Sequence, residues 1–163
     1  MIFGPDDSFL NRFAALLKIP GPLPLACAEA RFAPVYVQDV VEAMANALPD
    51  PTTFGRRYEL CGPDEFTLQE IVRLVALHSG RNKSIVGLPD WLSRLQARLL
   101  QFVPGKPFTP DNYASMRTAS VCKDNGLQRL GVIPTPLRDS VARMLGGANK
   151  AAWLNGLRQH ARR

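Results

Sequence analysis

The side chains best suited to chemistry are scattered through this sequence of 163 residues. Its three cysteines, Cys27, Cys61 and Cys122, include no Cys-x-x-C pair, and its two histidines, His78 and His160, lie far apart. A structural zinc site needs such ligands at close spacing, so the sequence indicates no metal site. An odd number of distant cysteines instead predicts buried free thiols in a reducing compartment, the cytoplasm or its membrane surface.

An acid–base pair is no easier to find. Tyr113 and Arg117 are four residues apart and would share one face of a helix predicted at 109–117. We interpret them as a surface or partly buried contact, with a catalytic pair as the less favoured alternative. No catalytic residue is assigned.

The charge is concentrated in the C-terminal third of the chain. The formal net charge is +6, and residues 104–163 alone hold ten Lys/Arg and three Asp/Glu. This basic third is interpreted as a solvated surface, with an acidic protein partner or an anionic membrane as the alternative. The basic, amphipathic tail at 148–163 fits the second use. Nucleic acid is an unlikely partner because no nucleic-acid motif accompanies the charge.

The elements that would position these residues alternate between short strands and helices, which predicts an α/β fold. At 46% hydrophobic and 21% charged, the composition is typical of one globular domain, without a long apolar run or a signal peptide. The central stretch is a strand over 32–37, with Pro34 at an edge position, followed by a helix with Asp39 as its N-cap. Helical spacing relates the apolar side chains of this helix, namely Val40, Val41, Met44, Ala45 and Leu48.

The other expected elements follow from caps and periodicity. A strand stub is predicted at Ile2-Phe3, a stiff loop at 20–24 and a strand at 57–62. A capping box at Thr67–Glu70 opens a helix. A further helix after Pro89 would turn its larger apolar side chains inward, namely Trp91, Leu92, Leu95, Leu99 and Phe102.

Several motifs, taken together and in this order, resemble one family. They are Ile2-Phe3-Gly4-Pro5, Pro34-Val35-Tyr36-Val37-x-Asp39, Tyr58-Glu59-Leu60-x-Gly62-Pro63 and Leu130-Gly131-Val132-x-Pro134. They resemble the C-terminal half of an extended or atypical short-chain dehydrogenase/reductase. More narrowly, they resemble the NAD(P)-binding accessory subunit of respiratory complex I and its bacterial relatives, which are NAD-dependent epimerase/dehydratase-like proteins.

This resemblance implies a two-lobed protein of which the chain is one part. The family's N-terminal half is a Rossmann domain with a glycine-rich phosphate turn, and the twelve glycines here form no G-x-G-x-x-G pattern. We therefore expect residues 1–147 to be the C-terminal substrate lobe, mostly helical with a few short strands, including the last strands of the nucleotide domain. NAD or NADP would bind the full-length protein, and this chain alone would bind neither tightly. Its partners would be the missing N-terminal Rossmann half and, through exposed strand edges at Ile2-Phe3 or Tyr58–Cys61, a second copy in a homodimer.

The resemblance also assigns site residues. Phe3, Gly4 and Pro5 would pass near the cofactor. Arg31 would grip substrate phosphates, the alternative being an ion pair with Glu29 or Asp39.

Two more residues, Asn11 and Tyr36, would line the cleft between the lobes as substrate-binding residues. The family's Tyr-x-x-x-Lys pair has no counterpart here, because the residues four positions after the three tyrosines are Val40, Gly62 and Arg117. Members that resemble the complex I subunit often lack this pair.

The function expected from the sequence is the substrate side of the cleft in an NAD(P)-dependent nucleoside-diphosphate-sugar epimerase/dehydratase-like or complex I accessory-subunit-like protein, inactive by itself. One alternative is a non-catalytic nucleotide-binding accessory or assembly protein of respiratory electron transfer. The other is a basic membrane- or nucleic-acid-binding module.

Overall fold

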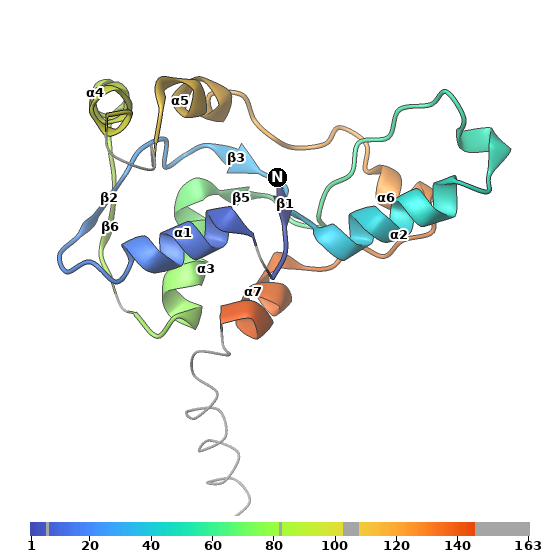
Figure 1. Cartoon of the computed structure of the whole chain (residues 1–163), viewed down its shortest axis with the longest axis horizontal. Helices are drawn as coiled ribbons and strands as arrows, with labels where there is room; N and C mark the ends of the chain where they lie inside the picture. Colours follow the sequence, from blue (N-terminus) through green and yellow to red (C-terminus); the bar gives the residue numbers. More distant parts are fainter. Residues whose placement is uncertain (6, 82, 103–107, 146–163) are drawn as a thin grey trace, which may run out of the picture.

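A computed structural model describes residues 1–5, 7–81, 83–102 and 108–145 (Figure 1). Its helices are α1 (Ser8–Leu16), α2 (Val37–Ala47), α3 (Leu68–His78), α4 (Asp90–Leu100), α5 (Pro110–Met116), α6 (Gly126–Arg129) and α7 (Leu137–Leu145), with a short 3-10 helix at Pro51–Thr53. Its strands are β1 (Ile2–Phe3), β2 (Leu23–Leu25), β3 (Arg31–Phe32), β4 (Val35–Tyr36), β5 (Phe66–Thr67) and β6 (Ile85–Gly87). The predicted fold class, a mostly helical α/β chain with a few short strands, is confirmed.

The strands form three separate pairs within the described residues. β1 pairs with β4 and β2 with β6, both in parallel, while β3 pairs with β5 antiparallel. The Ile2-Phe3 stub was expected to lack a partner inside the chain, yet it pairs with Val35 and Tyr36.

Three predictions about where strands lie, one of a loop and two of strands, are wrong. The predicted loop at 20–24 overlaps β2, which pairs with β6. The predicted strand at 32–37 is broken at Pro34, which has no N–H to donate, and Ala33 N donates instead to Ser120 O at 2.9 Å. The predicted strand at 57–62 forms a single bridge, between Glu59 and Asn125.

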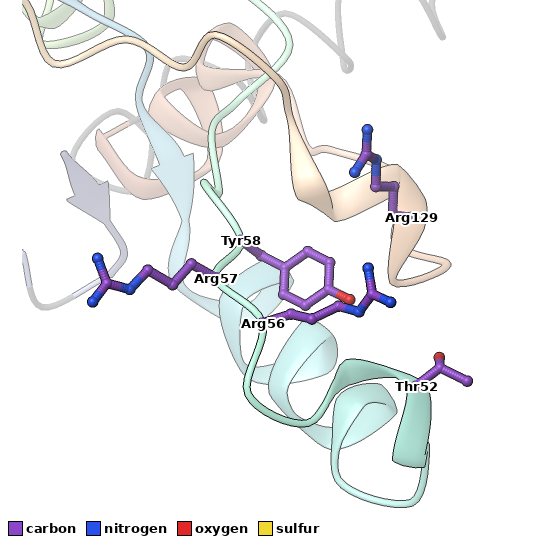
Figure 2. Close-up of a pocket in the computed structure, with 5 residues that line it drawn as sticks. All are labelled: Thr52, Arg56, Arg57, Tyr58 and Arg129. Carbon is purple, nitrogen blue, oxygen red and sulfur yellow. The ribbon is translucent and has the colours of Figure 1, made fainter.

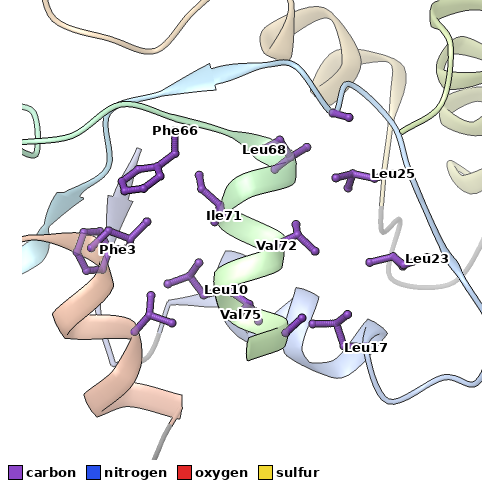
Figure 3. Packing of buried hydrophobic residues seen from close by; sticks show 14 residues of the cluster. Phe3, Leu10, Leu17, Leu23, Leu25, Phe66, Leu68, Ile71, Val72 and Val75 are labelled. Atoms are coloured by element: carbon purple, nitrogen blue, oxygen red, sulfur yellow. The ribbon is translucent and has the colours of Figure 1, made fainter. Parts of the chain in front are cut away.

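The main core surrounds α3. Ile71, Val72 and Val75 are fully buried on this helix, and side chains of α1, β2 and α7 pack against them (Figure 3). The predicted capping box is present, since Thr67 Oγ1 accepts from Glu70 N and the Glu70 carboxylate accepts from Thr67 N. A continuous core therefore joins elements from both ends of the described chain.

The prediction for α2 is wrong about where the helix begins. The helix begins at Val37, three residues earlier than predicted, so Asp39 lies inside its first turn and is buried instead of serving as the N-cap. Of the predicted apolar set, Val40 is buried, together with Asp39 and Ala43, whereas Val41, Met44 and Leu48 are 59%, 61% and 77% exposed. An apolar stripe on α2 is thus left without a partner in the described residues.

The predicted buried face of α4 is also wrong. Trp91, Leu95, Leu99 and Phe102 were predicted to face inward, and all four are exposed. The small side chains of Ser93 and Ala97 occupy the buried face instead.

Removing the buried Asp39 carboxylate should destabilise the fold. Its oxygens accept from Thr135 N at 2.7 Å and from the Thr135 hydroxyl at 2.8 Å, tying α2 to the segment before α7. We expect Asp39→Ala to lower the free energy of unfolding by about 2–3 kcal/mol, because it leaves a part-buried backbone N–H unpaired. Urea unfolding measures this, with Glu42→Ala, also on α2, as the control. An equal effect of the two variants would show that the Asp39 contacts contribute nothing.

The prediction of three free thiols is wrong for two of them. Cys61 and Cys122 form a disulfide with a Cα–Cα distance of 6.1 Å, and Cys27 remains free. Asn125 holds the two loops together beside it, donating to Cys61 O at 2.7 Å and accepting from Cys61 N at 3.3 Å. The pairing follows from this loop contact, which sequence separation does not reveal.

The basic tail predicted at 148–163 lies outside the described residues. Among the helices that are described, none has the length and apolar character required to cross a bilayer.

Candidate functional site

A cleft of about 700 Å³ opens beside Arg31. Its walls are the stretch Cys27–Arg31, the turn Gly87–Asp90 that leads into α4, and the end of α5 from Met116 to Ala119. Because these segments come from three parts of the chain, the cleft depends on how α4 and α5 dock.

Contacts among Asp90, Arg94 and Tyr113 hold α4 against α5 at the edge of the cleft. The Tyr113 hydroxyl donates to the Asp90 carboxylate, and Arg94 Nε donates to the Tyr113 oxygen at 3.0 Å. Arg94 Nη2 also lies 2.8 Å from Asp90 Oδ2. The hydrogen bond from Tyr113, with the nearby Arg94 charge, lowers the pKa of Asp90, so this carboxyl is ionised at neutral pH and does not serve as a general acid.

Cys27 lies in the cleft wall in a backbone conformation that is uncommon for a non-glycine residue, with φ of 51°. Its N–H donates to the buried Ser93 hydroxyl at 3.4 Å, which donates in turn to Pro89 O at 3.2 Å. Burial, and then the nearby Asp90 carboxylate, raises the pKa of the Cys27 thiol. The thiol is therefore protonated at neutral pH and is not a ready nucleophile.

Two arginines, Arg31 and Arg117, line the cleft together with two carboxylates, Glu29 and Asp90. Arg31 forms an ion pair with Glu65 on the exposed surface, so the predicted alternative partners, Glu29 and Asp39, are both replaced. Arg117 has no ion-pair partner among the described residues. A guanidinium donates two parallel hydrogen bonds to phosphate or carboxylate, and two of them in one cleft suit an anionic ligand.

The other residues predicted from the sequence lie together elsewhere, around β1 and the turn into α1. The Phe3 side chain is buried and packs on Tyr36, with ring centroids 5.4 Å apart. Asn11 Nδ2 donates to Asp7 O at 2.7 Å and to Pro5 O at 3.4 Å, which braces the turn after Gly4.

Of the six residues predicted to bind cofactor or substrate, Arg31 alone lines the 700 Å³ cleft. The structure thus gathers the other five at a separate place. Their binding roles stay predictions.

A second positively charged hollow, of about 520 Å³, lies near the 3-10 helix. Figure 2 shows Arg56 and Arg129 on either side of the Tyr58 ring, with Arg57 pointing away. Arg129 is partly neutralised by Asp124, whose Oδ2 lies 2.5 Å from its Nη2. This hollow provides an internal control for anion binding at the cleft.

Sequence reasoning missed Arg117 as a ligand candidate and missed the Arg56–Arg129 hollow. Arg117 is the C-cap of α5, and the sequence pattern relates it only to Tyr113. The Tyr113 hydroxyl is bonded to Asp90 and Arg94 instead. The adjacent arginines after Gly55 were the available signal for the hollow, but Arg129 joins them only through folding.

Comparisons with known proteins agree with the fold. The chain is 30% identical over 158 residues to NADH dehydrogenase [ubiquinone] 1 alpha subcomplex subunit 9, mitochondrial, of Rattus norvegicus, covering 94% of this chain and 42% of that protein. The subunit of the same name from Arabidopsis thaliana is 31% identical over 150 residues, covering 84% of this chain and 37% of that protein. The chain therefore spans less than half the length of these relatives. It matches no protein-family model.

Solved structures of other proteins share the fold of this chain. An NADPH-dependent quinone oxidoreductase (QOR2) from Escherichia coli superposes with a TM-score of 0.64 at 20% identity, covering 83% of this chain and 50% of that one. The protein gox2253 has a TM-score of 0.59 at 25% identity, covering 99% of this chain and 48% of that one. These findings confirm the resemblance read from the sequence.

Proposed function

We propose, from the relationship of this chain to the C-terminal half of the extended or atypical short-chain dehydrogenases/reductases, that it forms the substrate side of an NAD(P)-binding protein's cleft. The observation that carries the proposal is the placement of Arg31 and Arg117 in one 700 Å³ cleft. Two guanidinium groups suit a ligand with two phosphates, which supports a nucleoside diphosphate as the ligand class. The lobe binds and orients this ligand, and it supplies no acid–base pair.

The nucleotide-binding half would pack on two surfaces that lie free in the described chain. One is the α2 stripe of Val41, Met44 and Leu48, each more than half exposed. The other is β1, which pairs with β4 and includes the exposed Ile2. Burying such a stripe stabilises a domain interface, and a strand edge accepts another strand. Phe3, Gly4 and Pro5 would then lie at the junction with that half, where their backbone approaches NAD or NADP.

A non-catalytic accessory role is the second candidate. It is favoured by the missing Tyr-x-x-x-Lys pair and by the protonated Cys27 thiol, which leave the cleft without an evident reactive group. The relatives named as subunits of NADH dehydrogenase [ubiquinone] also favour this role. A location in the cytoplasm, or at the inner face of its membrane, belongs to the proposal, but the cysteines do not support it as free thiols would, because Cys61 and Cys122 form a disulfide. The relatives are named mitochondrial.

Ligand binding tests the cleft directly. We expect uridine diphosphate to bind the chain, as seen by calorimetry, and Arg31→Ala or Arg117→Ala to weaken binding about tenfold each, because each removes charge-assisted hydrogen bonds. Arg56→Ala, in the second hollow, should leave the affinity unchanged. The proposed cleft is wrong if uridine diphosphate does not bind, or if Arg56→Ala weakens binding and the cleft variants do not.

The same calorimeter tests the assignment of the cofactor to the other half. We expect no tight binding of NADH or NADPH to this chain, because the glycine-rich phosphate turn that cradles a pyrophosphate is absent from its sequence. A micromolar affinity would contradict this part of the proposal without touching the arginine cleft.

A further inference from the structure

The outer face of α4 carries three large apolar side chains that the described chain does not cover, and a fourth, Phe102, lies in the turn just after the helix. Trp91, Leu95, Leu99 and Phe102 are 66%, 48%, 60% and 82% exposed. The spacing of four residues places Trp91, Leu95 and Leu99 on one stripe of the helix, and Phe102 follows two residues after its last turn. α4 itself lies at the periphery of the described chain, with α5 beside it (Figure 1).

The described chain does not need this stripe to pack α4. The inner face of α4 already packs on the chain, with Ser93 and Ala97 buried and with Gln96 and Leu100 lining a pocket against α1 and β2. Rotating the helix to bury the outer stripe would expose this inner face. The helix thus has two faces to cover, and the described chain covers one.

Charge distinguishes the α4 stripe from the stripe on α2. On α4, Arg98 lies seven residues from Trp91, at the border of the stripe, and Arg94 lies one turn before it on the same side. Arg98 has no ion-pair partner among the described residues, whereas Arg94 is held by Asp90. The α2 helix contains Asp39 and Glu42 and no cation. The apolar stripe of α4 therefore favours an anionic surface.

We propose that α4 docks on the surface of an anionic bilayer. A tryptophan with leucine and phenylalanine on one face, and arginine at its border, is the pattern of helices that lie at the boundary of headgroups and acyl chains. The guanidinium of Arg98 would reach lipid phosphates while its stem lies along the apolar stripe. At eleven residues, α4 is about half the length needed to span a bilayer, so it would lie in the plane of the interface.

This inference does not depend on the proposed function. It also differs from the membrane contact expected for the tail at 148–163, since the residues that carry it belong to α4. A second copy of the chain, or another protein, is the alternative occupant that the experiment must separate.

The test uses the full chain and two kinds of vesicle, phosphatidylcholine alone and phosphatidylcholine mixed with phosphatidylglycerol. We expect co-sedimentation with the mixed vesicles, weakened by salt. Leu95→Asp with Leu99→Asp should reduce partitioning at least tenfold, because two carboxylates would enter the apolar boundary. Arg98→Ala should reduce it about fivefold. The matched pair Val41→Asp with Met44→Asp, on α2, should leave partitioning unchanged.

Fluorescence locates the contact. The chain has two tryptophans, Trp91 and Trp153, so Trp153→Phe leaves Trp91 as the only reporter. We expect its emission to shift to shorter wavelength with the mixed vesicles. Vesicle binding that survives the α4 substitutions, or a Trp91 emission that does not move, would overturn the proposal and leave the tail as the membrane contact. Loss of a dimer in light scattering on the α4 substitutions, without vesicle binding by the parent chain, would overturn it in favour of a second copy.

Discussion

Removing the Cys61–Cys122 disulfide should lower the free energy of unfolding by about 4 kcal/mol. The bridge joins residues separated by 61 positions, so it restricts a long loop in the unfolded chain, and the chain-entropy relation gives this size. The variant Cys61→Ser with Cys122→Ser should still fold. Asn125 continues to bond to residue 61, and Gly126 N donates to Glu59 O at 2.7 Å.

Urea unfolding without reductant measures the difference. Dithiothreitol should bring the parent chain to the stability of the double variant, and it should leave that variant unchanged. Equal urea midpoints for the parent and the variant would mean that the bridge does not contribute in solution. A loss of this size is a large fraction of the 5–15 kcal/mol typical of a folded domain.

The second large effect is expected at Gly62, a buried residue of the motif Leu60-x-Gly62-Pro63. A Cβ added to Gly62 would lie 1.9 Å from Pro34 O and 3.0 Å from Pro34 C. These are backbone atoms at the junction of β3 and β4, which cannot swing aside as a side chain does. Gly62→Ala should therefore lower the free energy of unfolding by about 3 kcal/mol or more.

Gly4→Ala provides the matched control. Its added Cβ would lie 2.7 Å from Val37 Cγ1, a side-chain atom in the first turn of α2 at the surface, instead of from backbone atoms. We expect a loss of about 1 kcal/mol or less there. If thermal and urea unfolding show the same loss for both glycines, the close approach of residue 62 to Pro34 is not a feature of the folded chain in solution.

Local signals predicted much of the fold. The capping box located α3, and the same kind of contact opens α1 and α5, since Asp7, Thr67 and Thr109 each accept from backbone N–H groups of the first turn. Such contacts involve residues two or three positions apart, so their residue types alone specify them. The same holds for the end of α3 at Gly80, whose φ of 68° favours glycine.

The candidate site was less predictable. Arg31 was chosen from the resemblance, and the structure places it in the cleft. Arg117 joins it there because the Asp90–Tyr113–Arg94 contacts dock α5 against α4. These contacts span 19 and 23 positions in the sequence, and no local pattern encodes them.

The sequence by itself determined where most helices begin, that the chain is α/β, and which family it resembles, because short-range hydrogen bonds and motif order suffice for these. The tertiary structure alone decided which face of α2 and α4 is buried, which cysteines meet, and which strands pair. Periodicity shows that a helix has an apolar face, but burial depends on what packs against that face. On α4 the small residues Ser93 and Ala97 pack against the rest of the chain, and on α2 Asp39, Val40 and Ala43 do so, while larger apolar residues of both helices point outward.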